Sequence, residues 1–368
     1  MTRMHRRILL FALMCASRPL RAQSVYDIGA RIAPQFHSYT VAAPSNLKVN
    51  EFAVPLFVVV PLTPLFTIDV GTSYARSHVE QTVLGKTTTS EISGLTDTQI
   101  RGHYVIGTDF IVLTAGVNVP TGRSTIPESK VIAASLIGSD FLSFPISNMG
   151  TGFGGTGGIA LARPLGEWNV GVGVSVRRSS QYDPVDVGGG PALHYQPGNE
   201  YRARIGVDRP VGTGRATFGV TYSAFGDDQL AGSVYNTGDR YFTQFDLNNS
   251  LGVGELSLSA WDLFRTTGTL AHGTALDHEN IVNAALSYGV RVGPATIEPN
   301  IEGRSWMQPG SSTSLMGTFG VRAQMAAGGM AVMPSIGFSV GRLAAQDNAV
   351  NTTASLTGFH ATLAVRLR

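Results

Sequence analysis

Charged side chains in this sequence stand at alternate positions of segments that are otherwise apolar or small. Arg202 and Arg204, for example, alternate with Ala203 and Ile205. A period of two puts alternate side chains on opposite faces of a β-strand, so the charged residues share one face. Such a face could favour anionic or carboxylate solutes, or could form a salt-bridged, wetted wall. The candidates are Arg101, Arg177, Arg202, Arg204, Arg215, Arg291, Arg304, Arg322 and Arg366, with Asp69, Asp97, Asp208, Asp246, Glu298 and Glu302.

A second set of candidate residues is apolar and lies where apolar residues are unexpected. Residues 52–60 are apolar on both faces of a predicted strand, and residues 131–146 (VIAASLIGSDFLSFPI) are too apolar for a solvated loop. Long loops of this kind are usually functional. These side chains could bind a hydrophobic solute, or could pack within the protein, because both roles need the same residues. The candidate substrate-binding residues are Phe57, Val59, Ile132, Leu136, Phe141, Leu142 and Phe144.

Signals for catalysis, metals and cofactors are poor. Residues 150–155 match G-x-G-x-x-G, but they enter a predicted β-hairpin instead of opening a helix. The pairs Asp227-Asp228 and Asp277-His278 have no serine or second histidine at a spacing that would complete a catalytic set. The histidines are scattered without metal-ligand spacing. We therefore predict that the protein is not an enzyme and has no cofactor or metal.

Composition favours a membrane barrel over a soluble domain. Charged residues make up only 14% of the chain, against about 25% in a typical soluble domain. Glycine is abundant, with 44 residues in 368. The formal net charge of +2 is too small to indicate a nucleic-acid partner.

The amino terminus has the pattern of a secretory signal peptide. Residues 3–7 are rich in basic side chains, residues 8–16 are apolar, and Ala22 ends a small-residue cleavage site. We predict that residues 1–22 are removed. The only cysteine, Cys15, lies in this segment, so the mature chain would hold no disulfide or thiolate metal site.

Residues 94–122 show the clearest β-hairpin. Two alternating arms flank Gly107-Thr108-Asp109, a connection of hairpin length. One face of the second arm is apolar, and we expect it to meet lipid, while Arg101 and Asn118 face the lumen. A lipid-facing arginine at the membrane midplane would cost roughly 2–4 kcal/mol, which sets this orientation. The lipid-facing residues are Ile111, Leu113, Val117 and Val119.

Similar hairpins continue to the end of the chain. Tight turns alternate with longer loops, as in outer-membrane barrels with short periplasmic turns and long external loops. Pro55, Pro61 and Pro64 exclude a membrane helix in the most apolar stretch, and only helices and closed barrels satisfy backbone groups in lipid. The prediction is an all-β transmembrane, antiparallel, up-and-down β-barrel of about 14–16 strands over residues 49–368. Further arms are expected at 50–61, 65–78, 152–163, 167–178, 200–210, 214–225, 239–248, 254–264, 280–292, 295–306, 312–325, 330–342 and 355–367.

Three details of this prediction concern irregular segments. Residues 23–48 form either an amino-terminal plug or a first strand. Pro55 cannot donate to a ladder, so a bulge or a break in pairing is expected there. Residues 80–95 are expected to be a polar loop, and residues 131–146 to fold onto the barrel mouth.

The sequence of the first hairpin resembles a known family. It resembles the outer-membrane family of the meta-cleavage pathway of phenol degradation, which is distantly like the long-chain fatty-acid transporters. The resemblance covers about 30 residues and implies a transporter-like barrel for hydrophobic or aromatic compounds, with an amino-terminal plug. It is carried by Gly94, Leu95, Asp97, Arg101, Tyr104, Gly116, Pro120, Thr121 and Gly122.

These observations predict an outer-membrane channel that passes small hydrophobic or aromatic molecules without energy input. The alternatives are a general porin for polar or anionic solutes and a structural or surface-binding barrel without transport. The expected partners are outer-membrane lipid, a small hydrophobic solute and the barrel-assembly machinery, with no nucleic acid. The sequence leaves the solute, the transport direction and the oligomeric state open.

Overall fold

The computed structural model describes residues 28–83, 85–107, 110–347 and 350–367. The predicted signal peptide and Cys15 therefore lie outside the described residues, as do Thr108 and Asp109 of the first hairpin turn.

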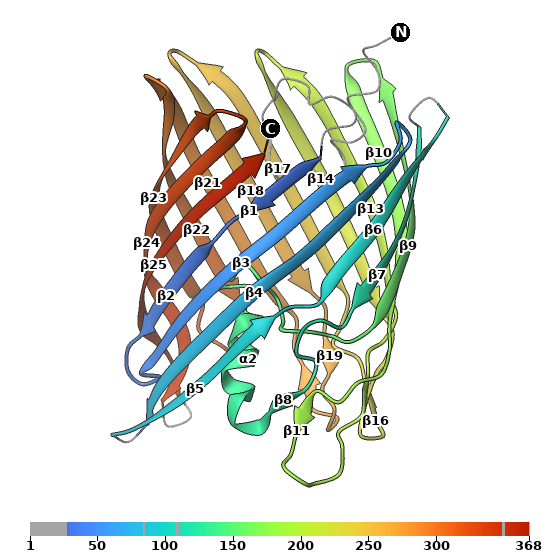
Figure 1. Ribbon diagram of the computed structural model, residues 1–368. Coiled ribbons are helices and arrows are strands. Elements are labelled where there is room, and N and C mark those ends of the chain that lie inside the picture. The colour runs from blue at the N-terminus through green and yellow to red at the C-terminus, as the bar shows by residue number, and fades with distance from the viewer. Residues whose placement is uncertain (1–27, 84, 108–109, 348–349, 368) are drawn as a thin grey trace.

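The wall is one continuous antiparallel sheet of 18 strand segments (Figure 1). Consecutive strands pair with each other, as the predicted up-and-down order requires. The segments are β1 (Gly29–Ile32), β2 (Gln35–Val41), β3 (Leu47–Pro61), β4 (Phe66–Val83), β5 (Lys86–Leu95), β6 (Thr98–Ile106), β7 (Ile111–Val119), β9 (Gly154–Leu165), β10 (Trp168–Ser179), β13 (Glu200–Val211), β14 (Gly214–Phe225), β17 (Arg240–Leu251), β18 (Gly254–Arg265), β21 (Glu279–Val292), β22 (Ala295–Met307), β23 (Ser314–Ala327), β24 (Met330–Asp347) and β25 (Val350–Leu367).

The sheet closes on itself into a barrel of 16 strands. β25 pairs with β24 on one side and with β1 and β2 on the other, where Arg31 lies opposite Arg366. β1 and β2 are two halves of one interrupted strand beside β3, and β5 and β6 are two halves of another beside β4. The predicted fold class is confirmed, with the strand count at its upper value.

The turns at one end of the barrel follow directly from the sequence. Only two residues connect β9 to β10, β13 to β14, β17 to β18, β21 to β22 and β23 to β24. The first residue of each is glycine at positive φ, as at Gly212 and Gly293, both with φ of 57°. Two-residue hairpins favour this backbone because its twist matches that of the strands. The long connections all lie at the other end, drawn at the bottom of Figure 1.

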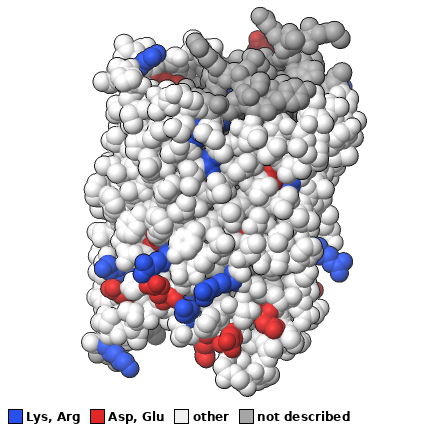
Figure 2. All heavy atoms as spheres, viewed as in Figure 1, with Lys and Arg blue, Asp and Glu red and all other residues white. Residues whose placement is uncertain are grey.

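The outer face of the wall is an apolar belt. Side chains such as Val174, Ile205 and Phe338 are more than half exposed, although they lie within strands. Figure 2 shows few charged atoms across the middle of this face and a gathering of them nearer the loop end. The orientation expected for the first hairpin is present, with Val117 exposed and Asn118 buried. Among the described residues, no helix is both long and apolar enough to cross a membrane.

Three segments were left open or were predicted differently from the sequence. Residues 80–95 are not a polar loop, since β4 continues to Val83 and β5 begins at Lys86. The consecutive threonines Thr87 to Thr89 hide its strand pattern, because they put polar side chains on both faces where the wall rises past the apolar belt. Pro55 stays in register with Ser73, and the break lies opposite it, between β1 and β2. Residues 29–32 and 35–41 belong to the wall.

Small elements lie outside the wall sheet, in the connections at the loop end. They are β8 (Ile126–Pro127), the 3-10 helix η1 (Glu128–Lys130), the helix α2 (Val131–Ile137), β11 (Val185–Asp186), β12 (Tyr195–Gln196), β15 (Asp228–Leu230), β16 (Ser233–Tyr235), β19 (Gly268–Thr269) and β20 (Ala275–Leu276). The sequence pattern did not predict α2.

The orientation of the wall predicts opposite effects of a new charge on its two faces. Ile205→Arg, in the middle of β13 on the outer face, should destabilise the folded barrel in lipid by roughly 2–4 kcal/mol, because the guanidinium loses its hydration. Gln244→Arg, on the inner face of β17 beside Asp246, should change stability by far less. The measurement is equilibrium unfolding by denaturant in lipid vesicles, and equal losses for the two variants would contradict the orientation.

Candidate functional site

The long connection between β7 and β9 lies inside the barrel near its loop end. We call residues 120–153 the inward loop. Its helix α2 packs on β4 and β5, and Phe141 and Phe144 contact the inner faces of β2 and β22. The expectation of a loop folded onto the mouth was therefore too shallow, because the loop spans the interior from one side of the wall to the other.

Asp97 holds the two ends of the inward loop together. This carboxylate sits in the gap between β5 and β6 and accepts hydrogen bonds from the backbone N–H of Gly122 at 3.1 Å and of Thr151 at 2.7 Å. It also accepts a bond from Asn118 Nδ2 at 2.8 Å. A Cβ on Gly122 would lie 2.1 Å from the Met149 carbonyl oxygen, so only glycine allows this approach. Residues that carry the family resemblance thus build the base of the loop.

Arg304 holds the far tip of the inward loop. Its buried guanidinium donates to the Phe141 carbonyl oxygen at 2.7 Å and to the Ser143 hydroxyl. It also donates to Asn283 Oδ1 at 3.0 Å and pairs with Glu302 at 2.5 Å. The sequence indicated only that Arg304 faces inward, and its role as an anchor depends on a segment more than 160 positions away.

Most of the predicted apolar binding residues are packed away. Phe141 is 1% exposed and Leu142 is 5% exposed. Phe144 makes an edge contact with the Tyr39 ring, and Leu136 packs beside the buried Ala133 and Ile137 of α2. This arrangement corresponds to the packing alternative for these residues. Ile132, on the side of α2 away from that cluster, remains 48% exposed.

Phe57 and Val59 lie elsewhere. Both are on the inner face of β3, where Phe57 is opposite Gly71 and Val59 is opposite Asp69. They belong to the half of β3 that pairs with β1, toward the short-turn end. The structure therefore does not bring them together with the apolar residues of the inward loop.

A buried polar cluster lies under the inward loop. Glu51 and Ser77 are fully buried on facing positions of β3 and β4, and the His37 and His360 rings stack at 5.7 Å beside them. Within the described part of the chain, the Glu51 carboxylate oxygens and both His37 ring nitrogens have no hydrogen-bond partner. Burying polar atoms without hydrogen-bond partners is unfavourable, so the contact between the loop and this part of the wall is less stable than a fully apolar contact would be.

On the opposite part of the wall, small residues occupy inner positions of the strands. Gly158, Gly171, Gly173, Gly206 and Gly219 occupy inner positions of β9, β10, β13 and β14. We call this glycine-lined strip the trough. Because these residues have no side chain, they place no bulk into the lumen, although Gly171, Gly206 and Gly219 are themselves covered by neighbouring atoms.

Arg204 projects into the trough. It lies between Gly173 and Thr221 in register, and a Cβ at Gly219 would be 3.8 Å from its Nη2 atom. Arg204 is exposed, and it has no hydrogen bond or ion pair with any residue that the structure describes. It therefore presents a free positive charge to the lumen.

Most of the other predicted lumen residues take part in ion pairs or hydrogen bonds. Ion pairs join Arg101 to Asp69 at 2.8 Å, Arg322 to Glu298 at 2.7 Å, Arg202 to Glu200 at 2.6 Å, and Arg215 to Asp208. Arg177 donates to Thr151 at 3.3 Å. Arg291 is exposed on the inner face of β21, Asp246 accepts from Gln244, and Arg366 lies opposite Ala331. Much of the inner wall is thus the salt-bridged surface that the sequence allowed.

Two aromatic rings, which sequence analysis did not select, flank the trough. Phe242 lies opposite Thr221, on the inner face of β17, and its ring centroid lies 6.1 Å from that of Trp261 on β18. Their inward positions alternate with outward Tyr241 and Phe245, so the apolar pattern alone does not separate them. Inward charged residues on the same strands, such as Asp246 on β17, are the sequence signal that could have identified these two rings as inward.

The possible catalytic pairs take part in loop structure. Asp228 accepts from the Gly198 N–H at 2.7 Å, and burial raises the pKa of its carboxyl. Asp227 accepts from Asn236 at 3.3 Å, and His278 contacts the Phe264 ring. Gly154, within the G-x-G-x-x-G match, begins β9. Over the described ranges, no three His, Cys, Asp or Glu side chains are placed to hold a metal ion.

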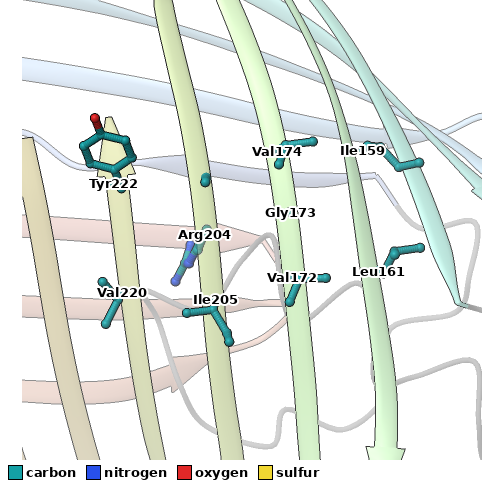
Figure 3. Close-up of a pocket in the computed structure, with 10 residues that line it drawn as sticks. Ile159, Leu161, Val172, Gly173, Val174, Arg204, Ile205, Val220 and Tyr222 are labelled. Atoms are coloured by element: carbon teal, nitrogen blue, oxygen red, sulfur yellow. The ribbon is translucent and has the colours of Figure 1, made fainter. Parts of the chain in front are cut away.

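A groove on the outer face is separate from this site. Figure 3 shows it between β9, β10, β13 and β14, with Ile159, Val172, Ile205 and Tyr222 around it. These residues belong to the outward set of their strands, so the groove opens toward lipid. It is not part of the passage.

Comparison with known proteins identifies similar barrels. No family model matches the chain, and no curated protein matches it. Among solved structures, OprB of Pseudomonas putida is similar with a TM-score of 0.49 and 10% identity, covering 92% of each chain. A bacterial polysaccharide outer membrane secretin has a TM-score of 0.48 and 10% identity, over 92% of this chain and 99% of that one. An outer membrane channel from Pseudomonas putida F1 has a TM-score of 0.40 and 12% identity, over 96% and 98%.

The anchoring role of Arg304 predicts that its removal opens the barrel. Arg304→Leu should release the tip of the inward loop, because hydrogen bonds to charged groups contribute about 1.5–3 kcal/mol each. Single-channel conductance should rise, and protease should cut residues 138–148 faster. Arg322→Leu, which removes an inward arginine that does not contact the loop, is the control. Unchanged conductance and cleavage in Arg304→Leu would show that the loop is held by other contacts.

Proposed function

We propose that this protein is a passive channel of an outer membrane, and that solutes pass through the trough between the inward loop and the glycine-lined wall. The closed sheet satisfies its own backbone hydrogen bonds, and its apolar belt suits lipid. The inward loop narrows the lumen on one side, while exposed inner residues such as Arg202 and Arg204 mark the hollow side. The long-loop end would face outward, as in other outer-membrane barrels.

The solutes that fit best are small anions with an aromatic or apolar body. The observation that carries this proposal is the free guanidinium of Arg204, two strands from the Phe242 ring and three strands from the Trp261 ring. Guanidinium groups bind carboxylates, and aromatic faces offer apolar contact in a preferred geometry. The resemblance of residues 94–122 to the phenol-degradation family agrees with an aromatic class of solute. The proposed solutes combine properties from two of the alternatives that the sequence offered, a channel for hydrophobic or aromatic molecules and a porin for anionic solutes.

The charge of Arg204 should set ion selectivity. In planar bilayers the wild-type channel should prefer anions, and Arg204→Gln should lower the anion-to-cation permeability ratio about fivefold, since a unit charge at 4 Å in water contributes about 1 kcal/mol. The measurement is the reversal potential in a salt gradient. Arg163→Gln, which removes a cation from the outer wall, should change nothing. A wild-type preference for cations would contradict the proposal.

The aromatic pair should discriminate between anions of equal charge. Phe242→Ala should lower the permeability of benzoate relative to acetate by about 2–10-fold, because an aromatic contact contributes about 0.5–1.5 kcal/mol. Thr221→Ala, at the neighbouring position in the trough, is the control. If Phe242→Ala leaves the benzoate-to-acetate ratio unchanged, the channel is a general anion porin.

A further inference from the structure

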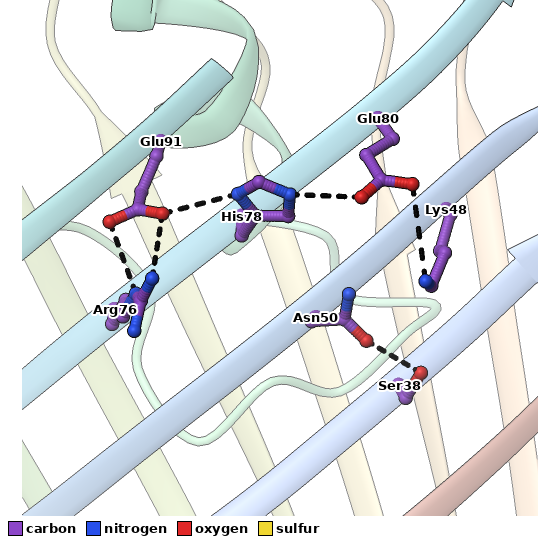
Figure 4. A network of polar contacts seen from close by, with 7 residues as sticks. All are labelled: Ser38, Lys48, Asn50, Arg76, His78, Glu80 and Glu91. Atoms are coloured by element: carbon purple, nitrogen blue, oxygen red, sulfur yellow. Dashed lines mark hydrogen bonds and ion pairs between the residues drawn. The ribbon is translucent and has the colours of Figure 1, made fainter. Parts of the chain in front are cut away.

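A polar network covers the outer wall where β2 to β5 rise above the apolar belt. Arg76 binds Glu91 through Nε at 3.1 Å and Nη2 at 2.8 Å, and His78 lies 3.2 Å from both Glu91 and Glu80. Lys48 is 3.9 Å from Glu80. Figure 4 shows this chain of contacts across the strands, with the Ser38–Asn50 hydrogen bond of 2.7 Å next to it. We call these residues the outer rim network.

The network begins where the apolar belt ends. On β4 the outward positions are Ile68, Val70, Thr72 and Tyr74, and the next is Arg76. On β3 the outward Leu56 and Phe52 are followed by Asn50 and Lys48. Aromatic residues at such a border sit at the level of lipid headgroups. In the membrane orientation proposed above, the network therefore stands at the headgroup level of the outer leaflet.

The network keeps hydrogen-bond donors that point away from the wall. Arg76 uses Nε and Nη2 on Glu91, which leaves Nη1 free, and its side chain is 55% exposed. The Lys48 ammonium has three donors and one distant acceptor, and its side chain is 49% exposed. Asn50 accepts from Ser38 through Oδ1, so its amide N–H groups are spare. Registers place Asn50 between these two cations, opposite His78.

Glu80 and Glu91 orient the cations instead of burying them. Each carboxylate is about two-fifths exposed, so the charges stay accessible to a ligand from outside the wall. Arg342 adds a further exposed cation at the outward position that follows Val340 on β24. Spare donors beside an aromatic border fit an amphipathic anion that has acyl chains below and phosphate groups above. Phosphate favours guanidinium donors in particular.

We propose that the outer rim network binds the phosphorylated sugar headgroup of an outer-leaflet glycolipid. Lys48, Asn50 and Arg76 donate to the phosphate oxygens, and Phe36, Phe52 and Tyr74 contact the acyl chains. This inference rests on the proposed membrane orientation, but it does not depend on which solute the channel passes.

The test uses the purified full-length barrel in detergent, titrated with lipopolysaccharide and followed by native mass spectrometry. Lys48→Ala with Arg76→Ala should weaken lipopolysaccharide binding roughly tenfold or more, because each basic group near an anionic lipid surface contributes separately. The matched control is Arg163→Ala with Arg209→Ala, which removes two outward cations at the short-turn end. Those cations lie over Phe110 and Trp168.

Other outcomes overturn the proposal. Equal lipopolysaccharide binding by the wild type and the rim variant would exclude the network as the site. Equal losses in the rim variant and the control would indicate unspecific attraction. If phosphatidylglycerol binds as tightly and depends on the same two residues, the site is a general phospholipid contact. Conductance of the rim variant in planar bilayers separates this test from the channel proposal, since it should equal that of the wild type.

Discussion

The structure depends on one constraint, which is that every backbone N–H and C=O in the wall needs a partner inside the sheet. Lipid offers none, so an open edge would leave a row of unpaired groups at several kcal/mol each. The pairing of β25 with β1 and β2 removes that edge. This closure makes a short interrupted strand near the amino terminus essential, although β1 has only four residues. It also creates an interior too wide for side chains of the wall to fill.

The width of the interior explains the inward loop. A barrel of 16 strands needs an internal segment if its passage is to be narrow. Residues 120–153 supply that segment, held at the base by Asp97 and at the tip by Arg304. Both anchors bind backbone atoms of the loop, and Arg304 also binds the Ser143 hydroxyl. The glycines on the facing wall place no side chains into the remaining space.

Local pattern determined how much of this structure was predictable. Alternation with a period of two identifies nearly all strands and assigns Arg101 and Asn118 to the inside. It fails at residues 80–95, where polar residues such as Thr87, Thr88 and Thr89 occupy both faces of the strand and Ile92 alone marks the face that packs on α2. It also fails for the inward loop, because Phe141 is buried by residues such as Trp306 that are distant in sequence. The apolar composition of the loop indicated that it is buried, but it could not indicate which residues bury it.

The inward loop contacts the wall through both apolar and polar residues. α2 rests on Val49, Ala75, Val79 and Ile92, an efficient hydrophobic packing. The tip has apolar contacts of its own, since Phe141 and Leu142 are buried with Tyr39 and Leu356, but Phe144 also lies against His37, whose ring nitrogens lack partners among the described residues. Such groups oppose burial, while the Arg304 contacts favour it. The attachment of the tip, unlike that of the helix, therefore combines apolar packing with favourable and unfavourable polar contacts.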